Sequence, residues 1–241
     1  MQKLSSQRGA FLNSSGTTIK MPSDNSLHKA AHKGDLDECK KYVEGDGTEG
    51  EELIGINEPG ASDRRALHRS AGAGHLQLCV YFIEKAAEID LVSFSSTTQI
   101  CILPKLCDSS EQYKSSLRIT NPFPCLQADK SGRTALHWAA ISGHTEIVRL
   151  LLEKGANIQA ETGSKMNALH GAVEGGRVDT VRALMEFVQG KDELKLALTT
   201  AKNGDDKTAW DISAASKNRA MCQILKDFGD SNGASSSCSI C

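Results

Sequence analysis

Residues 133–156 of the 241-residue chain read RTALHWAAISGHTEIVRLLLEKGA. The stretch predicts a short apolar helix over 135–141 and a longer helix over 145–154, because aliphatic residues recur on one broad face of the second segment. Gly143 permits a tight turn between them, and Gly155 follows the second helix, where chains often turn left-handed. One such pair cannot bury its own apolar face, so it must stack on neighbours.

Four further copies of this pattern are present. His137, in ALHWAA, is followed 33 residues later by His170 in ALHGAV. Upstream copies are ALHRSA, which contains His68, and SLHKAA, which contains His28. The last copy reads TAWDISAA, where Asp211 takes the place of the histidine.

These copies resemble the ankyrin repeat, whose signature is a T-P-L-H-x-A run at a period of about 33 residues. The best copy departs from it only at Ala135, where the family has proline. The resemblance implies an all-α fold, a solenoid of stacked helix–turn–helix units with short hairpin loops, over residues 23–229. The first and last copies are more polar than the others and are expected to cap the stack.

Composition excludes several classes of function. A hydrophobic content of 39% allows a sizeable core in one extended domain, and a net charge of −2 provides no basic field for nucleic acid. No apolar run approaches the length of a membrane span. Residues 1–22 carry three basic residues and no acidic ones, which suits either a transit peptide or, as we favour, a disordered tail. Met1 and Met21 are alternative starts.

Paired histidines raise the question of a metal site. His68 and His75 recur at the same spacing as His137 and His144. Both members of each pair occupy family positions, where the resemblance implies imidazoles that hydrogen-bond the backbone at turns. No thiolate or carboxylate completes a zinc ligand set, so no metal, cofactor or catalytic residue is predicted.

Three of the eight cysteines fall at one position of the repeat. Cys39, Cys79 and Cys222 correspond to Val148 and Val181 in the other copies. They are therefore predicted to be small buried apolar residues, one in each layer, and not disulfide partners. A reduced intracellular protein fits this cysteine usage best.

The distance from His68 to His137 is 69 residues, one period of 33 plus 36. The surplus is residues 92–127, which contain Cys101, Cys107 and Cys125 and do not resemble a repeat. One interpretation is a long loop at a hairpin tip, where insertions are tolerated and function often lies.

We favour another interpretation, a translated, retained intron. Residues 92–93 can be encoded by GTAAGT or GTGAGT, residues 120–121 by ACTAAC, and residues 123–127 by a pyrimidine-rich run that ends in CAG. These are the start, branch point and end of a common intron, in the correct order. The natural product would then lack 36 of the 241 residues and have 205.

Residues 230–241 form a Ser-rich segment of the kind that makes flexible linkers. It ends in Cys238, Ser239, Ile240 and Cys241, which resembles a C-a-a-X prenylation box with looser matches at Ser239 and the terminal cysteine. Prenylation of Cys238 would tether the protein peripherally to the cytosolic face of a membrane. The alternatives are an unmodified cytoplasmic tail and a C-x-x-C pair for metal binding or redox chemistry.

The resemblance implies a non-catalytic protein–protein interaction scaffold or adaptor, expected to be a monomer. Its partners would be proteins that bind a concave surface of hairpin tips and first helices. Trp138 is interpreted as core packing. Ile141 and Met166 are apolar at positions expected to be exposed, where they could anchor a partner. The predicted partner-binding residues are His32, Lys33, Arg64, Lys130, Ser131, Arg133, Ile141, Ser142, Met166 and Glu174.

Two alternative functions stay open. One is a dedicated inhibitor or assembly chaperone of a single enzyme or complex. The other is a thiol enzyme or metalloprotein that uses the cysteines, which their position in the repeat argues against.

Overall fold

The computed structural model describes residues 10–12, 18–20, 23–45, 53–85 and 128–228. Five helix pairs define repeats 1 to 5. The first helices of the pairs are α1 (Ser26–Lys33), α3 (Ala66–Ala73), α5 (Ala135–Ser142), α7 (Ala168–Glu174) and α10 (Ala209–Ala215). The second helices are α2 (Leu36–Glu44), α4 (Leu76–Glu84), α6 (Thr145–Glu153), α8 (Val178–Val188) and α11 (Arg219–Phe228).

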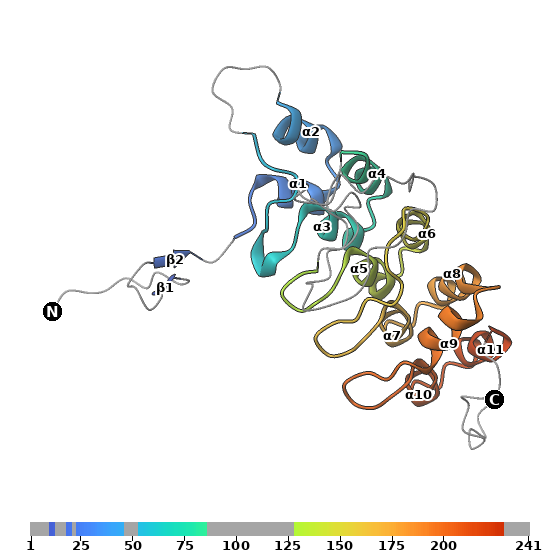
Figure 1. The fold of residues 1–241 in the computed structure, drawn as a ribbon. Coiled ribbons are helices and arrows are strands. Elements are labelled where there is room, and N and C mark those ends of the chain that lie inside the picture. Colours follow the sequence, from blue (N-terminus) through green and yellow to red (C-terminus); the bar gives the residue numbers. More distant parts are fainter. Residues whose placement is uncertain (1–9, 13–17, 21–22, 46–52, 86–127, 229–241) are drawn as a thin grey trace, which may run out of the picture.

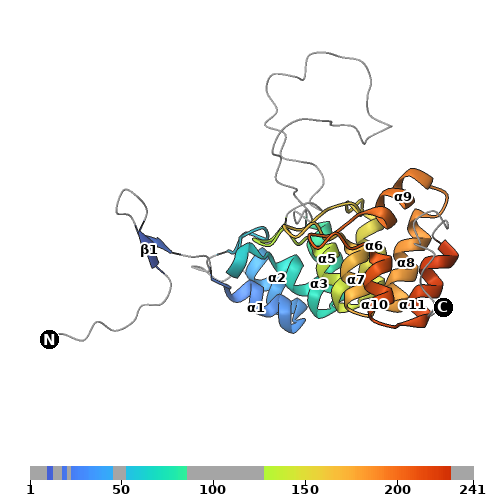
Figure 2. The ribbon, with the colours of Figure 1, turned by 90° about the horizontal axis from the view of Figure 1, so that it is seen from below.

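The five pairs stack side by side in chain order. Each first helix packs on the next one, and α4, α6, α8 and α11 form a second row behind them (Figure 1). The loops between successive pairs project from one side of this double row (Figures 1 and 2). This arrangement confirms the predicted fold class, a solenoid of stacked helix–turn–helix units.

Local sequence explains where each unit begins and ends. Thr134 caps α5 through its side chain, which accepts a hydrogen bond from the backbone N–H of His137. Gly143 ends α5 with a φ of 89°, a left-handed conformation that glycine adopts without strain. The sequence predicted both helices of this repeat to within one residue at each end.

The core is built from the same positions in every repeat. The leucine before the histidine signature is at most 1% exposed in repeats 1 to 4, and each second helix contributes its apolar face. Shared positions therefore form one continuous core along the stack. The equivalent leucines are Leu27, Leu67, Leu136 and Leu169.

One helix was missed by the sequence analysis. Helix α9 (Asp192–Thr200) lies between α8 and α10 (Figure 2). His170 and Asp211 are 41 residues apart, eight more than one period, and this surplus was a signal for an additional element. Leu198 of α9 is 1% exposed, and its carbonyl oxygen accepts a hydrogen bond from Asn167 Nδ2 at 3.3 Å.

Repeats 2 and 3 stack directly, although residues 86–127 separate them in sequence. Lys130 N–H donates to the carbonyl oxygen of Ser62 at 2.9 Å, and His144 Nε2 donates to that of Gly72 at 3.2 Å. The predicted insertion at 92–127 lies outside the described residues, as does the tail at 230–241. Within residues 1–22 the structure describes only two antiparallel strands, β1 (Ala10–Leu12) and β2 (Thr18–Lys20).

Candidate protein-binding surface

The hairpin loops between repeats share one closure. In each, a backbone N–H donates across the loop to a carbonyl oxygen four residues later, as Asp129 does to Arg133 at 2.8 Å. Neighbouring loops are also bonded edge to edge. The N–H groups of Lys130, Gly163 and Gly204 donate to the preceding loop at 2.8–3.0 Å. The loop tips and first helices thus form a fixed surface, here called the hairpin–helix surface.

The signature histidines hold this surface to the helices behind it. His137 Nδ1 accepts from the N–H of Thr134 at 3.2 Å, and its Nε2 donates to the carbonyl oxygen of Met166 in the next repeat at 3.1 Å. His170 reaches Lys207 in the same way at 3.3 Å. Burial lowers the pKa of His137 to about 4, so the imidazole is neutral in the folded protein. The predicted backbone-bonding role of these histidines is confirmed.

The second histidine of each pair bonds in the opposite direction along the stack. His75 Nε2 donates to the carbonyl oxygen of His32 at 3.0 Å, and His144 donates to Gly72. All four paired histidines therefore lie at turns. Among the described residues, no group of three or more histidine, cysteine, aspartate or glutamate side chains is placed to hold a metal ion.

The three cysteines of the repeat are core residues, as predicted. Cys39, Cys79 and Cys222 are at most 1% exposed, like Val148 and Val181 at the equivalent positions. Burial raises the pKa of Cys39 to about 12 and that of Cys79 to about 11. Since the thiolate is the reactive form, neither thiol is suited to nucleophilic chemistry at neutral pH.

The structure places the predicted partner-binding residues on the hairpin–helix surface in two groups. The fully exposed group is His32, Lys33, Lys130, Ser131 and Glu174. The half-buried group is Arg64, Arg133, Ile141, Ser142 and Met166.

The expected exposure of Ile141 is corrected. Its side chain packs against Gly171 in the next repeat, where an added Cβ would lie 2.8 Å from Ile141 Cγ1. Glycine at position 171 leaves the space that Ile141 fills. Met166 is likewise only half-buried, and its backbone closes a hairpin by accepting from Thr162 N–H at 2.9 Å.

The interpretation of Trp138 as a core residue is also corrected. The side chain is half-buried, and two guanidinium groups lie over its ring. The Cζ atoms of Arg64 and Arg133 are 4.5 and 5.2 Å from the ring centroid, distances that indicate cation–π contacts. The sequence analysis named both arginines but did not pair them with the tryptophan.

Asp129 orders this cluster from below. Its side chain is only 1% exposed, and Oδ1 accepts from the N–H groups of Ser131 and Arg133 at 2.8 and 3.0 Å. Oδ2 accepts from Trp138 Nε1 at 3.2 Å and lies 3.6 Å from Arg64 Nε. One buried carboxylate thus fixes the loop tip, the indole and one arginine together.

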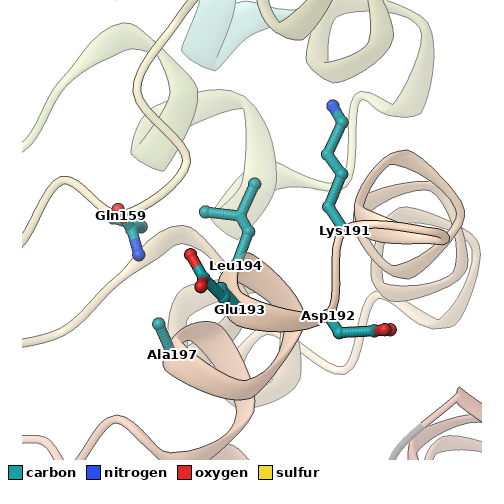
Figure 3. Close-up of a pocket in the computed structure, with 6 residues that line it drawn as sticks. All are labelled: Gln159, Lys191, Asp192, Glu193, Leu194 and Ala197. Carbon is teal, nitrogen blue, oxygen red and sulfur yellow. The ribbon is translucent and has the colours of Figure 1, made fainter.

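A depression elsewhere on the molecule is lined by Gln159 and by residues at the start of α9 (Figure 3). Lys191, Asp192 and Glu193 surround it with charges of both signs (Figure 3). None of the predicted site residues lies there, so it is separate from the surface described above.

These features define the class of protein as a helical repeat solenoid with a fixed surface of loop tips. Residues 131–163 match the family model of the ankyrin repeat. The chain is therefore an ankyrin-repeat protein. Ankyrin repeats are protein–protein interaction scaffolds, and members of this family are generally non-catalytic modules.

Three relatives illustrate the similarity. The NF-kappa-B inhibitor cactus of Drosophila melanogaster is 31% identical over 188 residues, covering 73% of this chain and 34% of the relative. A putative ankyrin repeat protein of fowlpox virus, FPV014, is 35% identical over 98 residues, 41% of this chain and 21% of the relative. The palmitoyltransferase Hip14 of Drosophila melanogaster is 44% identical over 61 residues, 24% and 9% respectively.

The chain thus spans about a third of the length of cactus and less of the other two relatives. Across the described ranges, none of the helices is long and apolar enough to cross a membrane.

Proposed function

We propose that the chain is a non-catalytic adaptor that binds a protein partner through the hairpin–helix surface. The observation that carries this proposal is the division of labour along the loops. Backbone groups and buried side chains hold the loop tips in place, while the side chains of Lys130 and Ser131 are exposed and not needed for that closure. A rigid frame with free side chains binds without a large ordering cost.

The test is capture of partners from the organism's own cells with substitutions on and off this surface. Lys130→Glu and Ser131→Glu change exposed loop-tip residues, and Arg182→Glu changes an exposed residue of α8 as the matched control. Partners should be lost with the two loop-tip variants and kept with the control. Equal capture by all three variants would place binding elsewhere.

A second candidate is a dedicated inhibitor of one enzyme or complex. It is supported by the similarity to cactus, an NF-kappa-B inhibitor, over 73% of this chain. Titration of the purified chain into the captured partner separates the two functions. A stoichiometric loss of the partner's activity indicates an inhibitor, whereas unchanged activity together with recruitment of a third protein indicates an adaptor.

We also propose that Cys238 is prenylated, which would tether the adaptor to a cytosolic membrane face. Support comes only from the terminal Cys-Ser-Ile-Cys sequence. One lipid chain binds membranes weakly, so the attachment would be reversible. Mass spectrometry of the protein from its own cells tests it: an intact, unmodified terminal peptide excludes the lipid.

A further inference from the structure

The charge of the hairpin–helix surface is uneven along the stack. Repeats 1 to 3 present exposed Lys29, Lys33 and Lys130, in addition to the half-buried Arg64 and Arg133. Two of the nearby carboxylates are already engaged. Asp129 is buried under the tryptophan cluster, and Asp24 binds Arg69 Nη2 with an Oδ1 distance of 2.7 Å.

Exposed acidic residues are few on this part of the surface. Glu58 and Asp63 border the loop of repeat 2, and Glu58 accepts a hydrogen bond from Asn25 Nδ2 at 3.1 Å. The positive side chains therefore outnumber the free carboxylates around repeats 1 to 3. Such a surface favours a partner that carries negative charge.

Arg64 and Arg133 are the best-placed cations on this surface. Their loops are bonded edge to edge through Lys130 N–H and Ser62 O, so the two arginines cannot separate without breaking that contact. Among residues 23–45, 53–85 and 128–228, no acceptor within hydrogen-bonding distance is found for the terminal nitrogens of Arg64 or the side chain of Arg133. Their donors are thus available to a ligand.

Stacking on the indole pre-orients both guanidinium groups. A planar guanidinium that lies over an aromatic ring keeps the donors along its edge free, and this edge matches a carboxylate in a two-bond geometry. Tryptophan and arginine are also the residues that most often dominate binding energy at protein interfaces. The indole itself is held by Asp129 at 3.2 Å, so little order needs to be imposed on binding.

We propose that Arg64 and Arg133, stacked on Trp138, bind the carboxylates of an acidic peptide segment in the protein partner. This inference rests on the proposed function and specifies the chemistry of the partner. A segment with separate carboxylates fits better than a continuous polyanion such as nucleic acid, because Glu58 and Asp63 border the cluster and would repel an unbroken run of phosphates.

The probe is a terminally blocked octaglutamate peptide at 0.15 M salt, with octaglutamine and inorganic phosphate as comparisons. The full chain has two tryptophans, and Trp210→Phe assigns the indole N–H signal of Trp138 in NMR spectra. We expect octaglutamate to shift the Trp138 signal, octaglutamine to leave it unchanged, and the double variant R64Q/R133Q to bind at least tenfold more weakly. Arg182→Gln is the matched control and should bind like the parent.

A conservative variant separates the arginine fork from charge alone. R64K/R133K keeps both charges, and we expect it to lose most of the binding while its urea midpoint stays close to that of the parent. Unchanged octaglutamate affinity in R64Q/R133Q, or phosphate binding tighter than that of the peptide, would overturn the proposal. Natural partners that are lost with Lys130→Glu but kept by R64Q/R133Q would also overturn it and leave the adaptor function intact. Natural partners kept by both variants would instead contradict the adaptor surface itself.

Discussion

Arg177 Nε donates a hydrogen bond to the carbonyl oxygen of Ile141 at 3.2 Å, which joins repeat 4 to repeat 3. His75 and His144 make the same connection one and two repeats earlier. An arginine therefore replaces a histidine at a position that must present one N–H donor to the preceding helix end. The residue type varies along the stack, whereas the hydrogen bond does not.

Substitution of Arg177 tests this equivalence. Arg177→Ala should lower the free energy of unfolding by about 1 kcal/mol, because it removes one hydrogen bond and the packing over Gly143. Arg177→His should lose less, since the ring can donate as it does in repeats 2 and 3. Urea denaturation measures both, and an equal loss in the two variants would show that the donor is unimportant.

Two glycines with the same left-handed backbone should respond differently to alanine. Gly74 and Gly155 both have a φ of +88°. A Cβ at Gly155 would meet nothing within 4 Å, so G155A should cost only the left-handed strain of about 1 kcal/mol. A Cβ at Gly74 would lie 2.5 Å from His144 Cε1, so G74A should also displace the ring from its bond to Gly72. Urea midpoints should therefore be lower for G74A, and similar midpoints would contradict this account.

Stability should fall as the pH is lowered through the range from 6.5 to about 4. Burial lowers the pKa of His137 to about 4, whereas the unfolded chain titrates near 6.5, so protons bind preferentially to the unfolded state in this window. His137 alone should account for about 3 kcal/mol. Burial also lowers the pKa values of His28 and His170, which add in the same direction.

The control for this pH effect is His137→Gln, which keeps hydrogen-bonding groups but cannot titrate. Its free energy of unfolding should be lower at pH 7 and should change less between pH 7 and pH 4 than that of the parent. Parallel pH profiles for the two proteins would mean that His137 does not carry the effect.

The buried cysteines should be unreactive until the repeats unfold. Iodoacetamide at neutral pH should leave Cys39 and Cys79 unmodified in the native protein and modify both in urea, as read by mass spectrometry of their peptides. Replacement of Cys39, Cys79 and Cys222 by valine should preserve folding and binding, since valine occupies this position in repeats 3 and 4. Loss of a measured activity by the folded triple variant would revive the thiol enzyme.

Removal of residues 92–127 should leave the stack intact. Repeats 2 and 3 already bond directly through Lys130 and Ser62, so the deletion would restore the ordinary spacing. We expect the shortened chain to keep its helical circular dichroism and its melting temperature within a few degrees. Sequencing of the gene and of its spliced transcripts tests the intron hypothesis separately, and spliced messages that retain the segment would reject it.

Repetition is what made much of this structure readable from sequence. A residue at a given position of one repeat meets the same surroundings in the next, which is why Cys39 could be assigned to the core from Val148. The same reasoning explains Asp211. Its carboxylate accepts from Thr208 N–H at 2.9 Å, the role that His137 Nδ1 fills in repeat 3, and as the last copy it has no following repeat to bond.

Departures from the repeat were harder to predict. Helix α9 occupies extra residues for which the other repeats have no equivalent, so a ruler of fixed length shows the surplus but not its conformation. The Trp138 cluster depends on side-chain directions at two adjacent loop tips. Burial of Ile141 depends on the missing side chain of Gly171 in the next repeat, a pairwise relation between layers that periodicity within one layer does not contain.

The direct bond between Lys130 and Ser62 also bears on how the chain folds. Signature histidines on either side of this junction are 69 residues apart in sequence, compared with 33 for repeats 3 and 4. Closing the longer stretch costs roughly 0.6 kcal/mol more in chain entropy. Folding of this form is therefore expected to nucleate among repeats 3 to 5, with repeats 1 and 2 docking last, and partial unfolding should begin where Lys130 leaves Ser62.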